Sequence, residues 1–283
     1  MKRKSNIRQV FEKLMRMCAF GESKHADKKR NHNQPARNKI YSRKTFETYL
    51  AICCRFARWV KDTYGCNDMD RAIRYVAAYL RWRIAIGRSA WTVRTEASAL
   101  AKLYQCGAAD FGVKLPKRRR QDVTQHRKGR WVRHFDPAAH KDLMAFCLSC
   151  GLRRHEVVKV RPQDVSVDAQ GRTTIHVLRG KGGKERNVTA LDDVPLKLAH
   201  RAAQRGDAYI FPSVPKYAPI HEWRRSYAQR LYARLTVPME QVPRSERYVC
   251  RRDRARVVYQ KKAMAVVSVN LGHSRIDVVT AYL

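Results

Sequence analysis

Apolar residues recur at helical spacing through most of the chain, in two blocks separated by a basic stretch. In the first block the apolar positions are Phe46, Tyr49, Leu50, Cys53, Phe56 and Val60, then Ile73, Val76, Tyr79 and Leu80, then Val93, Leu100 and Leu103. Steps of three and four residues place such positions on one face of a helix. The pattern therefore predicts a small helical domain over residues 46–113.

The second block, residues 134–283, begins with a marked helix. Asp136 is a natural N-cap, Pro137 suits the first turn, and Gly151 supplies the stop. Its apolar face is formed by Leu143, Phe146, Cys147 and Cys150. Further helices are predicted in residues 153–160, 194–204 and 222–235, followed by a pair that ends at Tyr282.

One stretch of the second block has the period of a strand. Thr173, Ile175 and Val177 alternate before Gly182 and Gly183, and a second apolar run follows these glycines. Alternation around a glycine turn predicts a β-hairpin, whose turn here carries lysines. The fold class expected is thus mainly α with a small β-hairpin or sheet.

The charge of the chain points to a polyanion. The 283 residues contain 60 Lys and Arg against 24 Asp and Glu, a formal net charge of +36. Such an excess is typical of proteins that bind nucleic acid, and double-stranded DNA is the first partner to expect. No run approaches eighteen apolar residues, and Glu12, Lys13 and Arg16 interrupt any signal-peptide core. We expect no membrane anchorage and a cytoplasmic, DNA-associated protein.

Two segments concentrate this charge. Residues 1–45 hold 14 Lys or Arg against 3 acids, and much of the segment lacks an apolar period, which predicts a flexible basic arm with a short helix near its start. Residues 114–133 hold nine basic residues and one acid. A plain spacer does not need that density, so we expect a linker that lies along the DNA backbone.

The eight cysteines are scattered along a chain large enough to fold without disulfides, so reduced thiols are expected. Cys147 and Cys150 form the one CxxC pair, whose spacing is also found in zinc and redox sites. The pair lies within a helical pattern without a second ligand pair nearby. Buried helix packing is the favoured interpretation.

Four short stretches in the second block carry candidate chemistry: CGLRRHEVVKV (150–160), RGKGGKER (179–186), HEWRR (221–225) and LGHSRIDVVTAYL (271–283). Each alone has an ordinary structural explanation, such as a solvated arginine or a glycine turn. Together, and in this order, they resemble the tyrosine recombinases of the phage integrase type. The resemblance covers most of the second block, whereas the first agrees only in size, charge and helical pattern.

This resemblance implies an N-terminal helical, SAM-like core-binding domain and a C-terminal α+β catalytic domain. It places the family's functional positions on Arg153, with Glu156 as structural companion, and on Lys181, His221, Arg224, His273 and Tyr282. The reaction implied is cleavage and rejoining of DNA through a 3′-phosphotyrosyl intermediate, for integration or excision by a phage or mobile element. A homo-tetramer on paired sites is implied, with an accessory DNA-bending protein as a further candidate partner.

Elementary chemistry is consistent with these assignments. Two arginines can neutralise the non-bridging oxygens of a pentavalent transition state, because their forked donors stay charged at working pH. A phenol with an ordinary pKa of about 10 needs a neighbouring base, for which His221 is the candidate, and Lys181 can protonate the leaving oxygen. His273 would donate to the phosphate. Neither a phosphate-binding GxxxxGK[ST] motif nor an acidic cluster is present, so no cofactor and no metal are expected.

Two features depart from the family pattern. Arg224 and His273 are 49 positions apart, which indicates an insertion and leaves Arg251, Arg252 or Arg254 as alternatives for the second arginine. This insertion is also a candidate DNA-contacting excursion. The second feature is that only Leu283 follows Tyr282 in this sequence. We expect the order of the tyrosine to depend on the helix leading into it, on DNA or on a neighbouring subunit.

Two other functions remain open from the sequence. A type IB-like topoisomerase would use the same chemistry as a monomer, and a catalytically inactive relative would only bind DNA. Relaxation of a plasmid without paired sites distinguishes the first, and formation of a covalent DNA adduct distinguishes the second.

Overall fold

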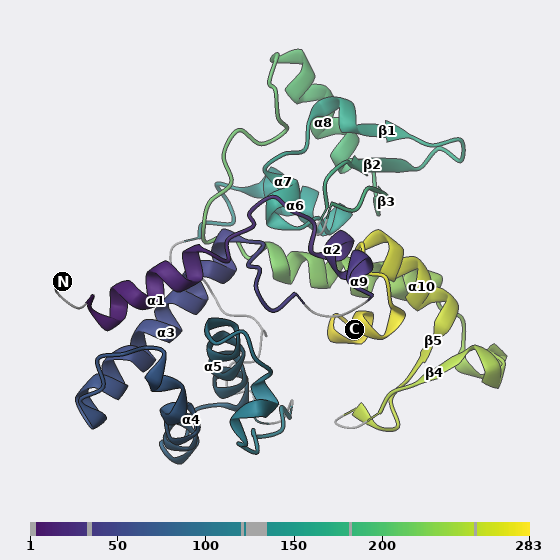
Figure 1. The fold of residues 1–283 in the computed structure, drawn as a ribbon. Coiled ribbons are helices and arrows are strands. Elements are labelled where there is room, and N and C mark those ends of the chain that lie inside the picture. Colours follow the sequence, from purple (N-terminus) through teal and green to yellow (C-terminus); the bar gives the residue numbers. More distant parts are fainter. Residues whose placement is uncertain (1–3, 33–35, 120–121, 123–134, 181–182, 252–253) are drawn as a thin grey trace. The chain divides into compact units, whose positions relative to one another are not determined.

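The computed structural model describes residues 4–32, 36–119, 122, 135–180, 183–251 and 254–283. The chain divides into two compact units, Met1–Thr124 and Gln125–Leu283 (Figure 1). Each unit has its own hydrophobic core. The division falls inside the predicted linker at 114–133, much of which lies outside the described residues. The predicted domain boundaries and the course of the linker along DNA stay predictions.

The first unit is built from helices. They are α1 (Asn6–Met15), α2 (Lys24–Arg30), α3 (Arg43–Tyr64), α4 (Val76–Ala85) and α5 (Ala90–Leu103), with 3-10 helices η1 (Arg71–Tyr75) and η2 (Ala108–Phe111). Four of the α-helices follow a serine whose hydroxyl accepts a backbone N–H of the first turn: Ser5, Ser23, Ser42 and Ser89. This cap satisfies one of the donors that a helix start leaves without a partner.

The core of the first unit lies among α1, α3, α4 and α5. Phe56 packs edge-on against Tyr79, with ring centroids 5.2 Å apart. Val10 and Leu14 of α1 are fully buried in the same core. α1 lies where a short helix is predicted near the start of residues 1–45, and its apolar stripe gives it a face to bury although the segment is basic.

The second unit contains five numbered α-helices among its described residues, together with short 3-10 helices. The helices are α6 (Lys141–Cys150), α7 (Arg154–Val157), α8 (Val194–Gln204), α9 (Ile220–Leu235), α10 (Lys261–Asn270) and the 3-10 helix η8 (Ile276–Ala281), which precedes Tyr282. The last element is thus a 3-10 helix and not the α-helix expected from the sequence. α6 begins later than predicted, because the Asp136 carboxylate accepts the N–H of Ala138 within a preceding turn.

A three-stranded antiparallel sheet lies in the second unit, in the order β1 (Val165–Val167), β2 (Thr173–Val177) and β3 (Arg186–Thr189). The β2–β3 pairing aligns Ile175 with Val188 and confirms the predicted hairpin. Lys181 and Gly182 of its turn lie outside the described residues. Together with the helices, this sheet agrees with the predicted fold class.

The insertion between α9 and α10 folds as a second small sheet. Strands β4 (Arg247–Val249) and β5 (Val258–Gln260) pair antiparallel, with Tyr248 opposite Tyr259. The 3-10 helices η5 (Met239–Gln241) and η6 (Arg244–Glu246) lead into β4.

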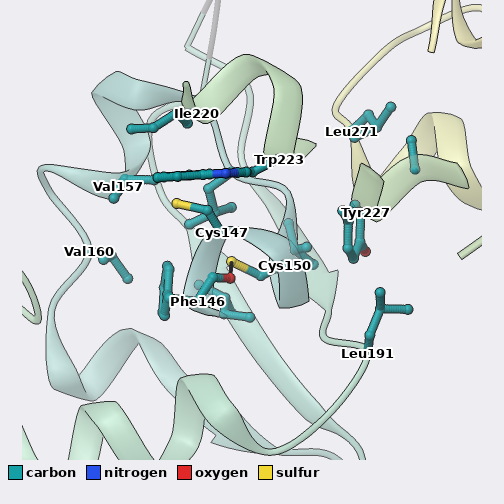
Figure 2. Close-up of a cluster of buried hydrophobic side chains, with 14 of the residues drawn as sticks. Phe146, Cys147, Cys150, Val157, Val160, Leu191, Ile220, Trp223, Tyr227 and Leu271 are labelled. Carbon is teal, nitrogen blue, oxygen red and sulfur yellow. Dashed lines mark hydrogen bonds between the residues drawn. The ribbon is translucent and has the colours of Figure 1, made fainter. Parts of the chain in front are cut away.

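The core of the second unit surrounds α6 and α9 (Figure 2). Cys147 and Cys150 are buried there beside Phe146 and Trp223. Burial raises the pKa of the Cys147 thiol to about 12 and that of Cys150 well above its ordinary value. The two cysteines therefore act as small apolar core residues, as the favoured interpretation predicted. Among the described helices, none is long and apolar enough to cross a membrane.

Candidate active site

The turn that ends α6 requires a glycine. Gly151 has a positive φ of 57°, and a Cβ atom added to it would lie 2.2 Å from Cδ1 of the Tyr227 ring. The carbonyl oxygen of Gly151 accepts a hydrogen bond from Nη1 of Arg224 at 2.5 Å. Because α6 and α9 approach closely at this glycine, the Gly151 carbonyl oxygen can hold the guanidinium group of Arg224 in position.

Arg153 follows two residues later, immediately before α7. Its backbone N–H donates to Oε2 of Glu156 at 2.8 Å, and its Nη1 donates to Oε1 at 3.0 Å. Its Nη2 donates to the carbonyl oxygen of Leu271 at 2.8 Å. The guanidinium is therefore oriented by a carboxylate on one side and by a backbone carbonyl after α10 on the other.

Glu156 is shared between two arginines. Arg186 at the start of β3 donates to both of its oxygens, at 3.0 and 2.8 Å, and its Nε donates to the carbonyl of Asn270 at 3.0 Å. Burial raises the pKa of Glu156, but hydrogen bonds from Arg186 and from the backbone of Arg153 outweigh it and hold the pKa at about 2. The carboxylate stays ionised at neutral pH and links α7 to β3, and Arg186 in turn links β3 to α10.

Arg224 is the most enclosed of the candidate residues. It lies in the first turns of α9, is 1% exposed, and donates through Nη2 to the Leu271 carbonyl at 2.5 Å. Burial, and then the charge of Arg153, lowers its pKa, whereas charge attraction and a hydrogen bond with Tyr282 oppose that shift. Its Nε has no hydrogen-bond partner among the described residues. A buried N–H donor that has no hydrogen-bond partner is suited to bind an anion.

Tyr282 lies against three of the other candidate residues. The guanidinium carbon of Arg224 is 5.6 Å from the centroid of its ring. The rings of His221 and His273 are each 5.6 Å from it, centroid to centroid. His221 opens α9, and His273 follows the turn after α10, where Gly272 has a positive φ of 64°. Residues from two separate stretches of the chain thus meet at one phenol.

Positive charge exceeds negative charge in this cluster. Among the described residues of this cluster, the guanidinium groups of Arg153, Arg186 and Arg224 are matched by the carboxylate of Glu156 alone. Two of them converge on the Leu271 carbonyl, so their donors are close enough to engage one small anion together. A phenol beside paired guanidinium groups is an arrangement suited to nucleophilic attack on a phosphodiester.

Not every predicted residue belongs to this cluster. Lys181 lies outside the described residues, although Gly180 just before it approaches the ion pair: a Cβ there would lie 2.8 Å from Nη1 of Arg186. Of the alternatives to Arg224, Arg252 also lies outside the described residues and Arg251 is exposed. Arg254 contacts the backbone near Tyr282 rather than its ring.

Sequence reasoning missed two residues that organise the site. Arg186 had a usable signal, because it shares a strand face with the apolar Val188 two residues later. Asn270 is a polar residue three positions after the buried Val267, on the apolar face of α10. Its side-chain oxygen accepts from the N–H of Thr189 at 2.7 Å and from the Tyr227 hydroxyl at 3.2 Å.

Comparison with known proteins identifies the family of the chain. The sequence pattern of the phage integrase family matches residues 129–283, more than half of the chain. The chain belongs to the phage integrase family. Its activity is that of a tyrosine-type site-specific DNA recombinase, as predicted. A search of curated proteins found no match.

Solved structures of the XerH site-specific recombinase share the fold. The XerH site-specific recombinase bound to palindromic difH substrate, in a post-cleavage complex, is 14% identical over 98% of this chain and 90% of its own, with a TM-score of 0.56. The pre-cleavage complex of XerH with difH substrate is 14% identical over 100% and 94%, with a TM-score of 0.55. A Tn1549 transposon integrase in complex with transposon right end DNA is 12% identical over 96% and 94%, with a TM-score of 0.46.

Proposed function

We propose that Tyr282 is the nucleophile with which this protein cleaves and rejoins duplex DNA. The observation that carries the proposal is the contact of the Tyr282 ring with Arg224, whose guanidinium shares the Leu271 carbonyl with Arg153. This contact supports the proposal, because two guanidinium groups beside the tyrosine are well suited to hold a scissile phosphate. It also supports an active enzyme over a relative that only binds DNA.

The proposed reaction is a transesterification that conserves bond energy. The Tyr282 oxygen attacks phosphorus, the bond from phosphorus to the 5′ oxygen breaks, and a 3′-phosphotyrosine forms. The phenolic proton passes to His221, and the leaving 5′ oxygen takes a proton from Lys181. Attack by a 5′ hydroxyl reverses the step and rejoins a strand.

Each remaining residue has a part in stabilising charge. Arg153 and Arg224 donate to the non-bridging oxygens, where negative charge grows in the transition state. His273 donates a further hydrogen bond to the phosphate. Glu156 and Arg186 touch no reacting atom in this scheme and act as positioning residues, because they hold the guanidinium of Arg153 in place.

Double-stranded DNA is the proposed substrate and partner. The formal charge of +36 supports binding to a polyanion, and the two XerH structures are themselves complexes with DNA substrate. A homo-tetramer on paired sites, with an accessory DNA-bending protein, is proposed for the recombination step. Light scattering of the protein on DNA carrying one site and two sites tests this assembly.

The nucleophile is tested with a suicide substrate. The DNA is a duplex that the protein selects from a random-sequence pool, nicked beside its cleavage point so that the cut strand diffuses away. The wild-type protein should form a DNA adduct that survives denaturant. Tyr282→Phe should form none, while Tyr209→Phe, at an exposed tyrosine, serves as the matched control. An adduct that persists in Tyr282→Phe contradicts the assignment.

A further inference from the structure

The β4–β5 insertion is anchored firmly to the end of α9. The side chain of Gln260 brackets Val237, donating from Nε2 to its carbonyl at 2.5 Å and accepting its N–H at 3.3 Å. The backbone N–H of Gln260 donates to the Tyr232 hydroxyl at 2.8 Å. Arg247 donates to the carbonyls of Val242 and Met239, at 2.9 and 3.0 Å. Hydrogen bonds therefore hold the base of the β4–β5 hairpin against the rest of the second unit.

Backbone hydrogen bonds hold the described residues that follow Arg254 in the hairpin loop. Cys250 N–H donates to the Val257 carbonyl at 2.9 Å, and Val257 N–H donates to the Arg254 carbonyl at 3.1 Å. Arg256 adopts a positive φ of 74° within the same turn. These hydrogen bonds fix the backbone position of Arg254, from which its side chain extends.

The Arg254 side chain ends at the segment that carries the tyrosine. Its Nη1 donates to the carbonyl oxygen of Thr280, two residues before Tyr282, and also lies 3.4 Å from the Tyr259 hydroxyl. The last carbonyls of a helix have no partner within it, so the guanidinium supplies one at the end of η8. The Tyr259 ring in turn packs edge-on against Tyr232 of α9, with centroids 5.7 Å apart.

We propose that Arg254 is a positioning residue for the nucleophile, through which the inserted hairpin holds the end of η8 and sets the place of the Tyr282 phenol. This inference rests on the proposed role of Tyr282. It gives the insertion a role in positioning the nucleophile, which differs from the DNA-contacting role expected from the sequence. The link runs from α9, which carries Arg224, through Tyr232, Tyr259 and Arg254 to the backbone beside Tyr282.

A positioning role and a DNA-contact role predict different losses. If the arginine only contacted phosphate, its removal would weaken binding and lower the dependence of binding on salt, as for any other exposed arginine of the insertion. If it holds η8, its removal leaves binding nearly intact and slows attack, because a misplaced nucleophile loses its alignment with phosphorus.

The test compares Arg254→Ala with Arg244→Ala, which removes an equal charge from an exposed residue of the same insertion. The rate of adduct formation is measured at saturating nicked duplex, and the equilibrium affinity is measured separately over a salt series. We expect Arg254→Ala to slow the adduct by about tenfold to hundredfold, with affinity changed by less than about threefold. Arg244→Ala should leave the adduct rate unchanged.

Two further variants separate positioning from loss of folding. Arg254→Lys keeps one donor for the Thr280 carbonyl and should recover part of the rate. Tyr259→Phe removes the hydroxyl beside Arg254 without changing charge and should slow the adduct by about threefold. The defect of Arg254→Ala should also persist on a substrate with a bridging 5′ sulfur, whose leaving group needs no proton, because nucleophile placement is unaffected by that sulfur.

The outcomes distinguish this inference from the function on which it rests. Equal adduct rates in Arg254→Ala and Arg244→Ala overturn the positioning role while Tyr282 remains the nucleophile. Full recovery of Arg254→Ala by the bridging sulfur overturns it as well, because it assigns the defect to the leaving group. A wild-type protein that forms no adduct on the DNA it selects contradicts both proposals.

Discussion

Arg153 and Arg224 donate hydrogen bonds to the same oxygen atom, the carbonyl of Leu271, at 2.8 and 2.5 Å. They come from different stretches of the chain, one before α7 and the other within α9. Their common acceptor immediately precedes Gly272 and His273. One backbone atom therefore gathers both guanidinium groups beside the segment that leads to Tyr282.

Replacing Arg224 by lysine should abolish most activity while the protein remains folded. Lysine keeps the charge but cannot reach the Gly151 and Leu271 carbonyls and a phosphate oxygen at the same time. Adduct formation should fall by about a hundredfold or more. Arg230→Lys, at an exposed position of the same helix, is the control, and an equal loss in both variants would argue against a specific role for Arg224.

Gly151→Ala should destabilise the second unit. The added methyl would enter the Tyr227 ring in a backbone conformation that alanine disfavours, at a cost of about 3 kcal/mol in the free energy of unfolding. Gly206→Ala is the matched control, since it has a positive φ of 73° but no atom within 4 Å of the added carbon. Denaturant unfolding of both variants measures the difference, and similar losses would contradict the predicted collision.

The ion pairs of Glu156 should make stability depend on acid pH. The pKa of Glu156 is lowered from 4.5 to about 2 in the folded state, so its contribution is complete above pH 4.5 and is lost as pH falls towards 2. The shift corresponds to about 3 kcal/mol. Glu156→Gln should therefore be less stable than wild type at pH 7, and this gap should narrow at pH 3. Exposed Glu240→Gln should show no such gap at either pH.

Binding to DNA should weaken steeply with salt. A protein of formal charge +36 that neutralises several phosphates releases as many counterions. We expect the affinity to fall by about a thousandfold between about 50 and 200 mM salt. Fluorescence anisotropy with a labelled duplex measures this, and a nearly flat response would count against DNA as the partner.

The CxxC cysteines should resist alkylation in the native protein. Cys147 and Cys150 are buried, and burial raises the pKa of both thiols. Mass spectrometry after iodoacetamide treatment at pH 8 should find them unmodified while half-buried Cys66 reacts first. Protection that disappears on adding a zinc chelator would favour the metal interpretation instead.

The sequence predicted the elements of the fold better than their ends. Helical spacing located α3 to α5, and alternation located the β2–β3 hairpin, because burial on one face leaves a period in the chain. The start of α6 was placed too early, since a carboxylate such as Asp136 can cap an isolated turn as readily as a helix. A short helix was predicted near the start of the basic segment 1–45, but its burial in the core of the first unit was not.

The sequence predicted the side chains of the candidate site, but not the groups that accept their hydrogen bonds. His221, Arg224, His273 and Tyr282 come together around one ring in the structure. The carbonyls that hold the arginines could not be predicted, because every residue has a carbonyl and only the fold selects one. Their catalytic roles stay predictions until they are tested.

Asn270 joins three elements at one point. Its backbone carbonyl accepts from Arg186, its side-chain oxygen accepts from β3 and from Tyr227 of α9, and its Nδ2 donates to Val266 of α10 at 3.0 Å. β3, α9 and α10 are therefore connected through one residue, so a substitution of Asn270 would disturb all three elements at once.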